Sequence, residues 1–271
     1  MLWRVKNSGL SILGSVHVLD VPPLPLAYGQ AEFGAATRVL FEHDLTQVPD
    51  MSFAQLKPGE SLSSLIPAAL YTTVEVRCRE WSLSLENFSH LQPWLVALAL
   101  SVHTASLAGL LAANGVDLNL LQLARAQGRT VEFLEDAAGA LRNFADAPLV
   151  EQIKMLSLAA EDIASGTDFF KRLIGGWKAG RADRVWACAQ ERVAQMPTMF
   201  GSLIEGRNRL WLPRLLALTK SSEPTFVVVG VLHMVGPAGL PALLRQSGCE
   251  VVPVDVTGEQ GSRSAGMLSN T

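Results

Sequence analysis

The first fifty residues alternate between short apolar runs and polar turns. Residues 2–6 and 10–14 fit the two strands of a hairpin, with Asn7-Ser8-Gly9 as the turn. Residues 28–37 follow with the pattern of a helix, and residues 38–44 are typical of a strand that ends in polar groups. This part of the chain therefore predicts three strands and one helix.

Sheet character returns near the end of the chain. Residues 225–229 form an apolar run that is typical of a strand buried on both faces. Residues 237–247 predict a helix that Gly248 ends. Residues 250–254 predict a last strand, and Pro253 favours an edge position because proline has no N–H to donate to a neighbouring strand.

The middle of the chain is mostly helical in its spacing of apolar positions. Residues 49–67 are mixed and loop-rich, whereas residues from about 81 to 211 predict a series of helices. One segment differs, because residues 129–136 are β-branched and aromatic before two carboxylates, and we expect a strand there. Asp117 is expected to cap a helix over residues 118–126.

These elements predict an α/β fold with a central mixed sheet formed from both chain ends. We expect a single domain over residues 1–256, in which residues 1–48 and 222–256 form the α/β core. Residues 49–221 would be a large, mostly helical insertion. Residues 257–271 are rich in glycine and serine and are expected to be a disordered tail.

Composition restricts the classes of partner. The chain has 271 residues, of which 49% are hydrophobic and 17% charged, so it can bury a full core. A formal net charge of −3 gives no reason to expect nucleic-acid binding. The sparse cysteines (Cys78, Cys188 and Cys249) argue against a disulfide framework, and no secretory signal is recognised, which together indicate a cytoplasmic protein. The oligomeric state is left open.

One apolar stretch has to be tested as a membrane span. Residues 93–113 approach the roughly 20 apolar residues that cross a bilayer. The stretch contains polar residues such as Ser101 and His103, and it lacks an asymmetry of flanking lysine and arginine residues. We therefore expect a buried core helix, and membrane association is not expected.

Two segments at opposite ends of the chain share a Gly-x-x-His pattern. Each is an apolar run followed by Gly14-Ser-Val-His17 or by Gly230-Val-Leu-His233. Glycine would let the chain turn sharply off a strand, so that His17 and His233 project at the carboxyl ends of their strands, where open α/β sheets bind ligands. Imidazole is the commonest metal ligand and general base. A single such histidine more often bonds a nearby backbone carbonyl, but the pair favours a site.

Two carboxylates follow other predicted strands. Glu42 could complete a ligand set of two histidines and one carboxylate, which leaves open positions on a divalent metal. Glu135 could act as a general base or orient a ligand. Both could instead cap the helix or loop that follows.

Arg207 and Asn208 are the remaining polar candidates. They could stabilise an oxyanion or bind a substrate carboxylate, although a solvated helix start is the ordinary interpretation. His43, His90 and His103 are assigned structural roles.

Taken in order, these motifs resemble the TraB/GumN family, which includes the pheromone-shutdown proteins and the Tiki metalloproteases. The resemblance rests on Leu2-Trp3-Arg4-Val5, the block ending at His17, Glu42-x-Asp44, Pro93-Trp94, Gly115-Val116-Asp117, Leu134-Glu135, Arg207-Asn208 and the block from Val229 to Gly248. It implies an α/β fold related to haem-binding and erythromycin-esterase-like proteins and, for the Tiki branch, divalent-metal peptidase activity. Family roles carry over onto His17, Glu42 and His233, with Glu135, Arg207 and Asn208 in support.

The resulting hypothesis is a metal-dependent hydrolase, most simply a peptidase acting on a peptide or another small substrate. His17, Glu42 and His233 would hold a divalent ion such as Mn, Co or Zn, whose bound water attacks the substrate carbonyl while Arg207 stabilises the oxyanion. One alternative is a non-catalytic protein that binds a peptide or haem. Another is a metal-independent esterase in which Glu42 orients His17 as general base.

Overall fold

A computed structural model describes residues 1–22, 29–161 and 163–254 of the chain. The expected tail at 257–271 lies outside these described residues, as does Tyr28 at the start of the first expected helix. The expected hairpin is confirmed, because the first two strands pair antiparallel around Asn7-Ser8-Gly9. The helix that follows covers Gln30–Ala35 and is labelled α1.

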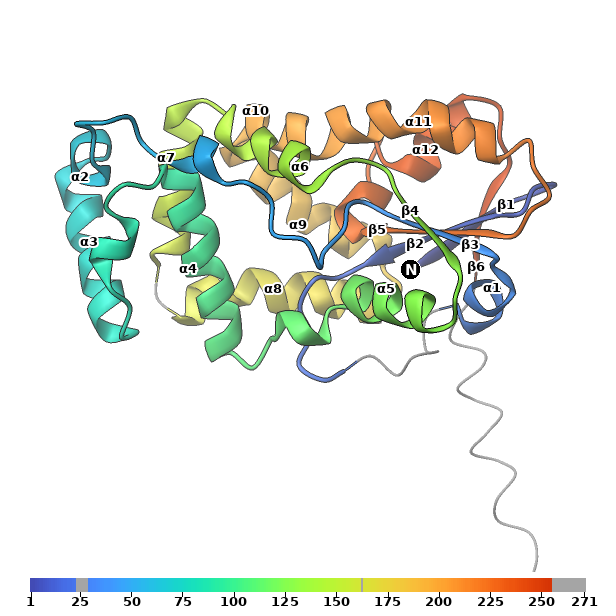
Figure 1. Ribbon diagram of the computed structural model, residues 1–271, viewed down its shortest axis with the longest axis horizontal. Coiled ribbons are helices and arrows are strands. Elements are labelled where there is room, and N and C mark those ends of the chain that lie inside the picture. Colours follow the sequence, from blue (N-terminus) through green and yellow to red (C-terminus); the bar gives the residue numbers. More distant parts are fainter. Residues whose placement is uncertain (23–28, 162, 255–271) are drawn as a thin grey trace, which may run out of the picture.

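The described residues form a mixed sheet of six strands, drawn from both ends of the chain as predicted (Figure 1). Its order is β4-β3-β5-β2-β1-β6, in which β4, β3, β5 and β2 are parallel and β1 runs antiparallel to both its neighbours. The edge position of the last strand is confirmed. The strands are β1 (Leu2–Val5), β2 (Leu10–Ser15), β3 (Arg38–Phe41), β4 (Thr130–Phe133), β5 (Thr225–Gly230) and β6 (Val251–Val254).

The two strands that carry the Gly-x-x-His segments are direct neighbours at the centre of the sheet. In the parallel register Gly14 lies opposite Val229, and Ser15 lies opposite Gly230. Every residue of both strands is buried, in agreement with their apolar sequences. Because parallel strands end at the same edge of a sheet, this register brings both histidine segments to one edge.

Helices cover the two faces of the sheet and extend beyond its carboxyl edge (Figure 1). Helix α5 packs against β3, β4 and β5, while α11 and α12 contact each other on the other side. The longer helices are α3 (Ala68–Glu80), α4 (Pro93–Leu107), α5 (Val116–Ala126), α6 (Ala137–Ala145), α7 (Leu149–Ala159), α8 (Ile163–Lys178), α9 (Ala182–Gln195), α11 (Arg207–Leu218) and α12 (Leu240–Gln246). Short helical segments are α2 (Leu62–Leu65), α10 (Pro197–Phe200), the π-helical turn Gly201–Gly206 and 3-10 turns at Ser52–Ala54, Leu85–Phe88, Ala112–Asn114 and Val231–Met234.

The long middle segment shares one hydrophobic core with the sheet. Trp177 of α8 and Trp211 of α11 are almost completely buried in the same cluster as the strands. The indole Nε1 of Trp177 donates a hydrogen bond of 2.6 Å to the carbonyl of Gly14. A second core joins α2, α3, α4 and α7 away from the sheet. The apolar stretch from residue 93 therefore forms a packed helix as expected, and within the described ranges no helix is long and apolar enough to cross a bilayer.

The expected helix cap at Asp117 is wrong. Helix α5 begins at Val116, and Gly115 is the residue that precedes its first turn. The N–H of Val116 donates to the carbonyl of Val16, which anchors the start of α5 beside the end of β2. Asp117 therefore lies inside the first turn of the helix, where one of its carboxylate oxygens bonds His17 and the other accepts from the N–H of Leu118.

Candidate functional site

The carboxyl edge of the sheet brings together polar residues from four parallel strands. His17 lies two residues beyond β2, Glu42 directly follows β3, and Glu135 lies two residues beyond β4. His233 lies in the 3-10 turn that follows β5. His17, Glu42, His233 and Arg207 line one cavity. Residues from opposite ends of the chain thus form one polar cluster.

Glu42 is at the centre of this cluster. Its Oε1 accepts a 2.5 Å hydrogen bond from the N–H of Gly230 and lies 3.7 Å from Nε2 of His233. A Cβ atom added to Gly230 would lie 3.3 Å from both Glu42 Oε1 and His17 Nε2. A side chain at position 230 would therefore crowd both His17 and Glu42.

The two motif glycines provide close packing rather than an unusual backbone turn. Gly230 has an ordinary φ of −55°, and Gly14 lies within β2 and is not among the residues with positive φ. A Cβ on Gly14 would come within 3.0 Å of Met234 Cγ and 3.2 Å of Val231 Cα. The predicted reason for these glycines, freedom of the backbone angle, is therefore wrong.

His17 is oriented by Asp117. The Nδ1 atom of His17 bonds to Oδ2 of Asp117, whose other oxygen accepts from the N–H of Leu118. The contact leaves Nε2 free to face the cavity, and 61% of the side-chain surface of His17 is accessible there. The Asp117 carboxylate raises the pKa of His17 to about 9, against the opposing effect of desolvation by the cavity walls. The metal-free imidazole is consequently protonated at neutral pH.

Asn208 orients His233 in a comparable way. Its amide nitrogen donates to the carbonyls of His233 and Ala238, at 3.1 and 2.8 Å. Its Oδ1 must then accept the 2.7 Å hydrogen bond from Nδ1–H of His233, which leaves a lone pair on Nε2. Burial lowers the pKa of His233 to about 3, so the imidazole is neutral. Asn208 is completely buried, and its amide nitrogen and oxygen are both bonded within the protein.

Arg207 holds the two carboxylates of the cluster together. It begins α11 directly after the π-helical turn, and only 8% of its surface is exposed, so it does not belong to a solvated helix start. Its Nε donates to Glu135 at 2.7 Å and its Nη2 pairs with both Glu42 and Glu135. Its Nη1 lies 3.2 Å from Nε2 of His233. The cluster therefore contains a buried guanidinium between two carboxylates.

This environment shifts the pKa values of Glu42 and Glu135 in opposite directions. Burial raises the pKa of Glu42, but contact with His233 and with the charge of Arg207 outweighs burial and holds that pKa well below its usual range. Because His233 is itself neutral, we attribute the effect to the charges of Arg207 and of the protonated His17. Burial also raises the pKa of Glu135, and here the opposing effect of Arg207 is smaller, so the net direction is upward. Glu135 is thus the better proton acceptor of the two.

His43 belongs to the cluster although its sequence position suggests a structural role. One ligand atom each from Glu42, His43 and Glu135 lies within 4.8 Å of the other two, close enough to hold a metal ion. Nδ1 of His43 is buried without a hydrogen-bond partner among the described residues. Among the described residues it is the one group of three that meets this distance, and it shares only Glu42 with the set of His17, Glu42 and His233 predicted from sequence. A histidine next to a strand-end carboxylate carries no spacing signal of its own, so sequence reasoning missed it.

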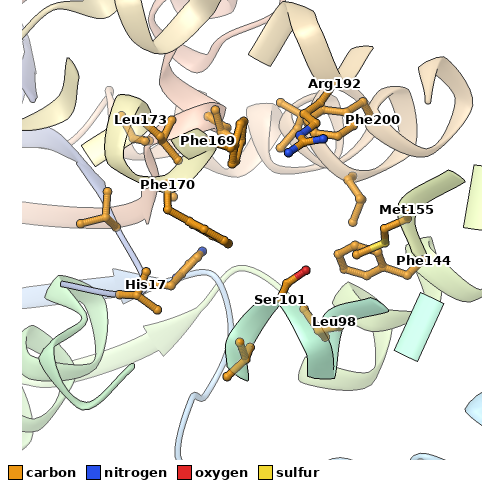
Figure 2. A pocket seen from close by; sticks show the side chains of 18 of the residues that line it. His17, Leu98, Ser101, Phe144, Met155, Phe169, Phe170, Leu173, Arg192 and Phe200 are labelled. Carbon is orange, nitrogen blue, oxygen red and sulfur yellow. The ribbon is translucent and has the colours of Figure 1, made fainter. Parts of the chain in front are cut away.

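The cavity continues from this polar cluster between the helices beyond the sheet. It has a volume of about 480 Å³, and most of its walls are apolar side chains of α4, α6, α7, α8 and α9. Figure 2 shows His17 pointing into this space from one side, with Phe170 beside it. The cluster is therefore one end of a long, largely apolar cavity.

The family of the chain follows from comparison of its sequence with known proteins. Residues 1–253 match the model of the TraB/PrgY/gumN family. The chain is 26% identical over 249 residues to the uncharacterized protein YbaP of Escherichia coli (strain K12) and, equally, to that of Shigella flexneri. Each match covers 88% of this chain and 89% of the relative. No solved structure matches significantly. The chain belongs to the TraB/PrgY/gumN family.

Proposed function

We propose that the protein is a metal-dependent hydrolase that cleaves peptides at the carboxyl edge of the sheet. His17, Glu42 and His233 would hold a divalent ion such as Mn, Co or Zn. The observation that carries this proposal is the orientation of the two imidazoles. Each uses Nδ1 to bond a partner, Asp117 or Asn208, and turns Nε2 toward the Glu42 region. Metal-binding histidines in proteins are commonly fixed in this way.

The chemistry of the surrounding donors fits such an ion. Imidazole nitrogen and carboxylate oxygen suit Mn, Co and Zn without selecting among them. The unpartnered Nδ1 of His43, close to Glu42 and Glu135, adds a further buried donor. Glu42 is ionised and His233 is neutral, which are the states that bind metals. Only His17 would have to lose a proton.

The chain's own groups have separable roles in the proposed reaction. When bound, a divalent ion supplies Lewis-acid activation of water and of the substrate carbonyl. Glu135, with its raised pKa, accepts the proton of the attacking water and can return it to the leaving amine. The N–H groups of Arg207 are bonded to Glu42, Glu135, Leu203 and His233, so its buried cation would stabilise developing negative charge on the carbonyl oxygen through its charge. Asp117 and Asn208 keep the imidazoles oriented.

The direct test is hydrolysis of a peptide library by chelator-treated protein to which Mn, Co or Zn is returned. We expect cleavage by the wild type and its loss in His17→Ala. His90→Ala, at an exposed histidine far from the cluster in sequence, is the matched control and should retain activity. Absence of hydrolysis in the wild type with every metal, or unchanged hydrolysis in His17→Ala, would contradict the proposal.

The pair of His17 and Asp117 supports a second candidate, a metal-independent esterase. Asp117, and not Glu42 as expected from sequence, would orient His17 as general base. With a pKa of about 9, His17 is mostly protonated at neutral pH, so such activity would increase as the pH approaches 9. Activity that survives EDTA and is lost in Asp117→Asn would favour this candidate over the metallohydrolase.

A further inference from the structure

The part of the cavity away from the polar cluster forms a chamber between helices. We call it the inner chamber, and its walls come from α4, α6, α7, α8, α9 and residues 196–204. Large apolar side chains dominate the walls, among them Leu98, Phe144, Met155, Phe169, Phe170 and Phe200 (Figure 2). The chamber is therefore suited to an apolar ligand.

The backbone around the inner chamber offers few hydrogen bonds to a ligand. Its wall elements are helices, in which N–H and C=O groups bond each other, and the sheet strands lie at the other end of the cavity. A peptide threaded into the chamber would leave buried amide groups without partners, which is costly. A hydrocarbon chain has no such groups and gains from leaving water.

A single basic residue, Arg192, projects into the inner chamber. It lies on α9 six residues beyond Trp186, whose ring packs against Gly236 near the end of β5. At 1.5 Å per residue, this places Arg192 about 9 Å further from the sheet along the helix. Figure 2 shows its guanidinium and the imidazole of His17 on opposite sides of the open space. Arg192 therefore lies at the far end from the polar cluster.

The guanidinium of Arg192 has room for an anionic partner. It stacks 4.4 Å from the ring centre of Phe169, and no ion pair joins it to a carboxylate of another described residue. Burial lowers its pKa, while the charges of Glu161, which also lines the cavity, and of Glu191 oppose this. Glu191 is instead paired with Arg172. A half-buried cation without a bonded carboxylate in an apolar chamber is complementary to a ligand anion.

We propose that the inner chamber binds the hydrocarbon chain of an amphiphile whose carboxylate pairs with Arg192. The chain would extend from Arg192 toward Phe170, beside the polar cluster. This binding requires neither a metal ion nor turnover, so it goes beyond the proposed hydrolase activity and stands independently of it. A fatty acid and an apolar peptide with a free carboxyl terminus both carry a carboxylate that could pair with Arg192. The lack of backbone partners in the chamber favours the fatty acid.

The test measures binding of sodium decanoate and of decanol to chelator-treated protein by isothermal titration calorimetry. The wild type should bind decanoate about tenfold more tightly than decanol, the size expected for one charge-assisted pair. Arg192→Met should abolish this preference, while Arg192→Lys should retain part of it. Arg184→Met, an exposed arginine on the same helix, should leave it unchanged. Equal affinity of the wild type for the two ligands, or no binding of decanoate, would overturn the proposal.

A second pair of variants tests the location without altering charge. Ser101 of α4 points into the chamber (Figure 2), whereas Ser106 of the same helix is exposed and does not line it. Ser101→Phe should weaken decanoate binding at least about tenfold by filling the space, and Ser106→Phe should not. His17→Ala should keep decanoate binding even where peptide hydrolysis is lost, which separates the two proposals. Tighter binding of an apolar tetrapeptide acid than of decanoate would overturn the fatty-acid assignment.

Discussion

Asp117 determines which nitrogen of His17 faces the cavity and whether it carries a proton. Asn208 has the same orienting role for His233, but it is neutral, and deep burial makes His233 a neutral imidazole. The two histidines of the repeated motif thus differ in charge although their sequence context is alike. The difference comes from the Asp117 carboxylate on α5 beside His17 and from the deep burial of His233.

We expect Asp117→Asn to lower the pKa of His17 from about 9 toward the usual 6.5 in metal-free protein, because the carboxylate is the main cause of the shift. Folding raises this pKa in the wild type. The pair therefore stabilises the folded state fully below pH 6.5, and this contribution is lost as the pH rises through 9. An NMR titration of the His17 imidazole measures the pKa directly. A wild-type value at or below 6.5 would contradict this account of the pair.

Arg207→Met should destabilise the protein strongly, because it leaves the buried carboxylates of Glu42 and Glu135 without their cation. We expect a loss of about 3–5 kcal/mol in the free energy of unfolding, the usual effect of breaking a buried ion pair from one side. Arg209→Met, on the exposed surface of the same helix, should change it by no more than about 0.5 kcal/mol. Urea denaturation measures both, and an equal effect of the two substitutions would contradict the structural role of Arg207.

Among the elements, the packing at the carboxyl ends of β2 and β5 depends on Gly14 and Gly230. The parallel strands and their polar endings could be predicted from apolar runs followed by histidine or glutamate. The π-helical turn before Arg207 could not, because no local pattern marks it. The contact between Asp117 in the first turn of α5 and His17 could not be predicted either. The local sequence around Asp117 suggests a helix cap and gives no sign of this tertiary contact.

Gly230→Ala should disturb the polar cluster, since the new Cβ would press on Glu42 Oε1 and His17 Nε2. We expect a loss of about 1–3 kcal/mol in stability from overpacking, together with weaker metal binding. Gly34→Ala is the control, because a Cβ there meets nothing within 4 Å and alanine favours the helix. Thermal denaturation distinguishes them, and an unperturbed Gly230→Ala protein that binds metal normally would show that this contact is unimportant.

At the scale of the whole molecule, the helical middle segment is joined to the sheet rather than set apart from it. Strand β4, from the expected insertion, pairs with β3, and Trp177 of α8 bonds Gly14 of β2. We therefore expect residues 1–254 to unfold as one unit. Urea unfolding followed by tryptophan fluorescence and by far-ultraviolet circular dichroism should give one transition with one midpoint. Two separated transitions would indicate independent domains.

Only those residues of the candidate site that directly follow predicted strands could be predicted from the sequence. His17, Glu42 and His233 follow apolar strands, so their meeting at one sheet edge follows from a parallel arrangement. Asp117 meets His17 through packing between elements that are distant along the chain. His43 follows Glu42 directly, but no spacing pattern marks it as a member of the site. The inner chamber depends on how six wall segments pack together. Its existence therefore lies beyond sequence reasoning.

Co²⁺ titration of chelator-treated protein by isothermal titration calorimetry shows whether the polar cluster binds one divalent ion. We predict one site per chain in the wild type and its loss in Glu42→Gln, because Glu42 belongs to both candidate ligand groups. Loss in His17→Ala with retention in His43→Ala would identify the ligand set predicted from sequence, and the reverse would identify the group around His43. No stoichiometric binding by the wild type, or binding unaffected by Glu42→Gln, would contradict the account.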